Sequence, residues 1–120
     1  MARRDITGAV DFAVLEGFTA GDQGVIEEVL SLFRHQVDVW KPMLDPRSEG
    51  WRDAAHTVKG AAAGIGAHAL ARVCGEAEVA VDAMAEPVLQ RVHMALDAAL
   101  ADVAAYQHEL MLKSLRSPLS

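Results

Sequence analysis

Residues 51–67 read WRDAAHTVKGAAAGIGA, and the spacing of their apolar side chains predicts an amphipathic helix that begins near Ser48. At roughly 100° per residue, the apolar residues of this segment fall on one arc of the helix. They are Trp51, Ala54, Ala55, Val58, Ala62 and Ile65. His56 falls nearly opposite the arc, so we expect its imidazole to face water while the other side of the helix packs into a core.

The His56 side of the helix carries two cations and a strip of small residues. Arg52 and Lys59 fall within about a sixth of a turn of His56 on one side, and Gly60 lies on the other. The strip continues, if the helix persists that far, through Ala63, Gly64 and Ala67. We expect these residues to form a surface on which a partner docks, although Gly64 equally suits a helix end or close helix packing.

This combination of groups suits phosphoryl transfer through a histidine. A histidine has a usual pKa of about 6.5, so much of it is unprotonated and nucleophilic near neutral pH. The ammonium of Lys59 can neutralise charge on phosphoryl oxygens. Gly60 in mid-helix costs about 1 kcal/mol relative to alanine, a cost that is understandable if another surface must approach the backbone there.

The remaining sequence predicts an all-α fold. Apolar residues recur every three or four positions from Asp22, a candidate N-cap, to Leu44, before Asp45-Pro46, and again from Leu70 to Met84, before Glu86-Pro87. A last, longest helix covers Leu89 to Leu110 and frays at Ser117-Pro118. Short connections make neighbouring helices antiparallel. We therefore expect an N-terminal arm and short helix over 1–21, and an up-down-up-down four-helix bundle over 22–116.

Composition narrows the possible partners and cofactors. A net charge of −6 argues against nucleic acid or an anionic membrane as a partner. Cys74 is the only cysteine, and no signal segment or membrane span is evident, so we expect a cytoplasmic protein, and a monomer. The other histidines lack metal-ligand spacing and are expected to be ordinary surface residues; they are His35, His68, His93 and His108.

The run from His56 to Ala67, followed by Leu70, Cys74 and Glu78, resembles histidine-containing phosphotransfer (HPt) domains. Their signature is a histidine, an apolar residue two positions later, Lys-Gly, small residues, an apolar-Gly pair and a leucine. One departure is Ala61, where these domains frequently have serine. The resemblance implies that His56 accepts the phosphoryl group, that Lys59 is its electrostatic partner, and that Gly60 is where a receiver domain approaches.

The resemblance further implies a phosphate carrier in a His-Asp-His-Asp phosphorelay. Its partners would be the receiver domain of a hybrid sensor kinase and that of a downstream response regulator. Mg²⁺ would belong to the receiver, so this chain would bind no metal or cofactor. We expect no enzyme with its own ATP site, because the sequence has no glycine-rich phosphate loop. The alternative is a helical adaptor that never carries phosphate.

Overall fold

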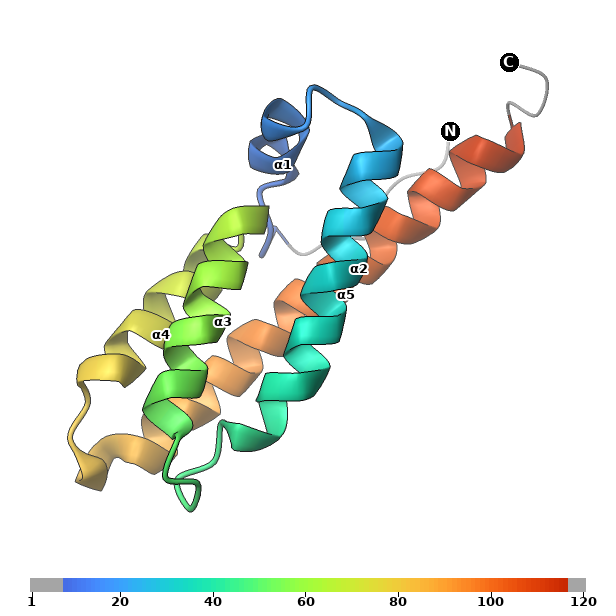
Figure 1. Cartoon of the computed structure of the whole chain (residues 1–120). Coiled ribbons are helices and arrows are strands. Elements are labelled where there is room, and N and C mark those ends of the chain that lie inside the picture. The colour runs from blue at the N-terminus through green and yellow to red at the C-terminus, as the bar shows by residue number, and fades with distance from the viewer. Residues whose placement is uncertain (1–7, 117–120) are drawn as a thin grey trace.

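The computed structural model describes residues 8–116, and all regular elements within that range are helical. Four helices alternate in direction to form an antiparallel bundle, with a short helix at one end of it (Figure 1). In chain order the helices are α1 (Phe12–Phe18), α2 (Gln23–Trp40), α3 (Trp51–Ile65), α4 (His68–Val79) and α5 (Ala85–Arg116). The predicted fold class is confirmed. The first seven residues of the expected N-terminal arm, and Ser117-Pro118, lie outside the described residues.

The core forms along the apolar stripes that the sequence predicts. All six residues of the predicted arc of α3 are buried. On the long helix α5, Leu89, Val92, Leu96 and Val103 are almost completely buried. Many of the remaining core residues are alanines, whose small side chains allow the helices to pack closely. This packing leaves the opposite side of α3 facing outward.

Helix α2 begins where the sequence predicts and ends before the predicted break. The Asp22 carboxylate accepts a hydrogen bond from the Val25 N–H at 3.1 Å, which makes Asp22 the N-cap. The regular helix ends at Trp40, not at the predicted Asp45-Pro46 break, and the 3-10 turn η1 (Lys41–Met43) follows. Pro42 lies in this turn and has no N–H to continue the α-helical hydrogen bonds.

The end of α4 also differs from the prediction. The apolar pattern places Val81 and Met84 on the stripe of α4, with the break at Pro87. Instead α4 ends at Val79, the 3-10 turn η2 (Asp82–Met84) follows, and both predicted core side chains are more than half exposed. Pro87 lies in the first turn of α5, where a missing N–H costs little because these N–H groups have no partner within the helix.

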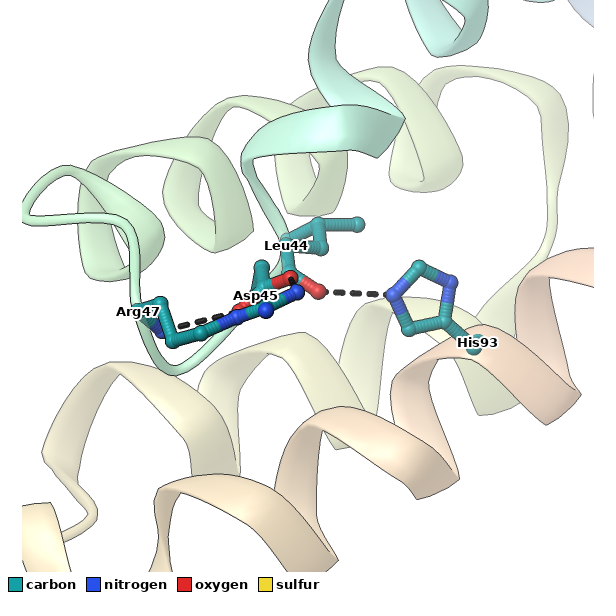
Figure 2. Close-up of polar contacts among 4 residues, drawn as sticks. All are labelled: Leu44, Asp45, Arg47 and His93. Atoms are coloured by element: carbon teal, nitrogen blue, oxygen red, sulfur yellow. Dashed lines mark hydrogen bonds and ion pairs between the residues drawn. The ribbon is translucent and has the colours of Figure 1, made fainter.

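The connection between α2 and α3 is held against α5 by a histidine (Figure 2). His93 on α5 donates from Nε2 to the Leu44 carbonyl at 2.7 Å, so it has a structural contact and is not the ordinary surface residue that the sequence predicts. Within the connection, the guanidinium and the backbone N–H of Arg47 both donate to Asp45, and the guanidinium above all lowers the pKa of Asp45 to about 2. The connection that leads into α3 is therefore bound to α5 at Leu44, and a local ion pair lies within it.

A left-handed turn ends α3 and brings the N-terminal segment onto it. Gly66 has φ 84°, and its carbonyl accepts a hydrogen bond from the Asp11 N–H at 2.9 Å. A Cβ at this position would lie 2.4 Å from the Asp11 carbonyl oxygen, so only glycine fits. The adjacent Val10 N–H donates to the buried Asp102 carboxylate of α5 at 3.0 Å. These bonds hold the segment that leads into α1 against the bundle.

Candidate functional site

His56 lies on the solvent side of α3, as the helical arithmetic predicts. Its side chain is 71% exposed, and the apolar residues on either side of it along the chain, Ala55 and Val58, are buried. The core packing of α3 therefore fixes the backbone of His56 and leaves the imidazole accessible to a large partner.

Glu78 of α4 binds two polar side chains of α3, those of His56 and Lys59. Its Oε1 pairs with Nδ1 of His56, and its Oε2 accepts a hydrogen bond from the Lys59 ammonium. An ionised carboxylate can only accept hydrogen bonds, so the proton of a neutral His56 resides on Nδ1. The lone pair is then on Nε2, which makes Nε2 the nucleophilic atom of the imidazole.

The same contacts keep Glu78 charged. The hydrogen bond from Lys59 lowers the pKa of Glu78 most, and the bond from His56 lowers it further, while partial burial opposes both. Glu78 is therefore a carboxylate at neutral pH. The Lys59 ammonium is paired with Glu78, and its side chain is still 38% exposed to solvent. Sequence reasoning includes Glu78 only as part of the family pattern and misses this role.

Gly60 and Gly64 lie on the exposed face, and internal packing does not require either of them. A Cβ at either position would meet no atom within 4 Å, which removes close helix packing as the reason for these glycines. Ala63 is also exposed. The three residues leave the backbone of α3 open to approach for about two turns beyond His56.

Ala67 is placed differently from the prediction, and Arg52 has partners within the protein. Ala67 is completely buried, because α3 ends at Ile65 and the chain turns at Gly66, so its predicted position on the docking strip is wrong. Arg52 is partly exposed, but its guanidinium donates to the Ala80 carbonyl at 2.7 Å and pairs with Asp82 at 2.8 Å. These bonds tie the beginning of α3 to the end of α4, the helix that carries Glu78.

An apolar groove of about 330 Å³ adjoins the exposed glycines, between α1, α2 and α3. Gly60, Ala61 and Gly64 line it on the α3 side. On the α2 side it is lined mainly by Val25, Val29, Leu32 and Phe33. The region around His56 thus combines a paired imidazole and lysine with an apolar depression on the same side of the bundle.

Comparison with known proteins identifies the family of this chain. The Hpt domain family model matches residues 25–109, which is well over half of the sequence. The chain belongs to the Hpt domain family. A solved structure, the histidine phosphotransferase ShpA from Caulobacter crescentus, is similar to this Hpt protein with 59% sequence identity and a TM-score of 0.81. The match covers 90% of this chain and 99% of that one. The comparison with curated proteins gives no match.

Family membership decides between the two functions that the sequence leaves open. The Hpt protein is a histidine phosphotransferase of a phosphorelay, a phosphocarrier and not a kinase, and its partners are receiver domains. The alternative hypothesis, a helical adaptor that never carries phosphate, is therefore rejected.

Other reactive groups are few among the residues that the structure describes. Among residues 8–116, no group of three or more histidine, cysteine or acidic side chains is placed to hold a metal ion. Cys74 is buried, and burial raises the pKa of its thiol to about 12, so the thiol is not a nucleophile at neutral pH. In the same range, no helix is both long and apolar enough to cross a membrane.

Proposed function

We propose that His56 is the phospho-accepting residue of this Hpt protein and that it relays phosphate from the receiver of a hybrid sensor kinase to a response regulator. The observation that carries the proposal is the pairing of an exposed imidazole with Glu78 through Nδ1. This pairing points the free lone pair of Nε2 away from the bundle, toward a docked receiver.

In the transfer, Nε2 of His56 attacks the phosphorus of an aspartyl phosphate on the receiver. The new N–P bond forms as the P–O bond to the aspartate breaks, and the aspartate leaves as a free carboxylate. The ring becomes positively charged, and Glu78 stabilises that charge through the Nδ1–H bond. Transfer to the second receiver reverses each step. The Mg²⁺ that assists the reaction is assigned to the receiver, following the family resemblance, and not to this chain.

Lys59 exchanges partners during the transfer. In the free protein its ammonium is bound to Glu78. When the adjacent imidazole carries a phosphoryl group, the three phosphoryl oxygens attract the ammonium more strongly than the Glu78 carboxylate does. Lys59 then neutralises the phosphoryl group while Glu78 retains its bond to His56. One carboxylate thus orients the nucleophile and holds the cation close to where it is needed.

The proposal is tested by mixing the purified chain with a receiver domain carrying ³²P on its aspartate. Wild-type protein should acquire label that is lost in acid and stable in base, as expected for phosphohistidine. The His56→Gln variant should acquire none, while His35→Gln, at an exposed position on α2, should be labelled normally. Label retained in His56→Gln would show that another residue is the acceptor.

A further inference from the structure

Phe18, at the end of α1, is the most exposed aromatic side chain among residues 8–116. It is 81% exposed and lies on the rim of the groove between α1, α2 and α3. The groove is almost entirely apolar, with Thr19 and Gln36 as its polar side chains. A large aromatic ring left in water beside an apolar depression is typical of a surface that a partner covers.

The position of the groove identifies the partner as the receiver domain. At 1.5 Å per residue, Gly60 lies about 6 Å and Gly64 about 12 Å along α3 from His56. A protein interface of standard size covers about 800 Å² per partner, equivalent to a disc of about 16 Å radius. A receiver that brings its aspartate to His56 therefore also covers the part of the groove lined by these two glycines.

Helix α1 is firmly attached, so it presents Phe18 in a defined place. The Tyr106 hydroxyl of α5 donates to the Glu16 carboxylate at 2.5 Å, and the Tyr106 ring stacks on Phe12 with centroids 4.1 Å apart. At the start of the helix, the Asp11 N–H is bound to the Gly66 carbonyl. The helix is thus held at its first residues and again two residues before Phe18.

Helix α1 also lies outside the part of the chain that matches the Hpt family model, which begins at residue 25. The α2 and α3 walls of the groove fall within the residues that this model matches, whereas the α1 wall does not. A residue outside the family pattern can differ between Hpt proteins, so an aromatic contact on the α1 wall is well placed to distinguish one receiver domain from another.

We propose that Phe18 is a specificity-determining contact that packs against an apolar patch of the cognate receiver domain and selects it over other receivers. The inference rests on the proposed relay through His56. It assigns to Phe18 a role in binding and none in the chemical step, because its ring contacts the partner and not the reacting atoms.

The test compares Phe18→Ala with Met94→Ala, which shortens a 69% exposed apolar side chain on α5. The probe is the phosphorylated receiver that labels the wild-type chain fastest among the receivers of the host. Phe18→Ala should raise KM for this receiver at least fivefold and change kcat less than twofold. The preference of Phe18→Ala for this receiver over the receiver that labels wild type second fastest should fall by a similar factor. Phe18→Leu should restore most of the wild-type KM and preference. Met94→Ala should behave as wild type.

A small phosphodonor separates failure of this inference from failure of the proposed function. Phosphoramidate transfers its phosphoryl group to a histidine nitrogen with release of ammonia, and it needs no docking surface. It should label wild type and Phe18→Ala equally, at His56. Equal KM values for Phe18→Ala and Met94→Ala would overturn the selection role while leaving the relay intact. Loss of phosphoramidate labelling in Phe18→Ala would also overturn it, by showing a structural effect. Absence of labelling at His56 in wild type would overturn the relay and this inference together.

Discussion

Replacing Gly60 with glutamine should make the protein more stable and a much poorer phosphate carrier. Gly60 lies inside α3, and a Cβ there meets no atom within 4 Å. The substitution therefore removes the helix cost of glycine, about 1 kcal/mol, and replaces it with the smaller cost of glutamine, for a net gain of about 0.5 kcal/mol. For a domain of this size the melting temperature should rise by about 2 °C.

The same substitution should slow phosphoryl transfer. The new side chain projects from a point about 6 Å along the helix from His56, inside the area that a docked receiver must cover. A displacement of the reacting atoms by about 1 Å costs on the order of 100-fold in rate. We therefore expect transfer from a phosphorylated receiver to slow by about 100-fold. The control is Ala101→Gln, which adds the same side chain at an exposed position on α5.

Melting followed by circular dichroism and transfer followed with ³²P-labelled receiver measure the two effects in the same samples. Ala101→Gln should transfer at the wild-type rate. A normal transfer rate in Gly60→Gln would refute the docking role of the glycine. A fall of several degrees in its melting temperature would instead show that the protein's own packing needs glycine at this position.

Two further predictions concern the turn after α3 and the charge beside the imidazole. Gly66→Ala should lower the free energy of unfolding, measured in urea titrations, by about 2–3 kcal/mol. A left-handed alanine costs about 1–2 kcal/mol, and the clash with Asp11 breaks a hydrogen bond worth about 1 kcal/mol. An unchanged free energy of unfolding would contradict the turn geometry. Glu78→Gln should lower stability at neutral pH and flatten its acid dependence, since the pKa of Glu78 is depressed by Lys59 and His56 from its usual 4.5. The stability that Glu78 contributes is present above about pH 4.5 and is lost as the pH falls through the lowered pKa. Urea titrations from about pH 6 to about pH 3 measure this, and parallel profiles for wild type and variant would contradict it.

The sequence is sufficient to predict the helices because their buried faces are continuous. The apolar spacing in α3 places Val58 in the core and His56 in water, and both positions follow from the helical repeat alone. The ends of the helices are less predictable because they depend on contacts between elements. The Ala80 carbonyl, just past the end of α4, is bound by Arg52 of α3, and Ala67 is buried because Gly66 turns the chain. Neither contact leaves a periodic signal in the sequence.

The sequence likewise predicts only some residues of the site. Lys59 and Gly60 lie close to His56 on one helix, so their spacing is enough to place them together. Glu78 lies 22 residues away from His56 and reaches it only because α3 and α4 pack side by side. Phe18 likewise approaches the groove through the packing of α1 against α5. Residues contributed by neighbouring helices are visible only once the bundle is assembled.

The position of the phosphoryl group on the imidazole is the most direct test of the relay. After transfer from a receiver to uniformly ¹⁵N-labelled protein, long-range ¹H–¹⁵N spectra distinguish the two ring nitrogens of each histidine. We predict one phosphohistidine, at His56, with phosphorus on Nε2 and a proton retained on Nδ1 beside Glu78. Phosphorus on Nδ1 of His56, or on any of the other four histidines, would contradict the proposed role of this site.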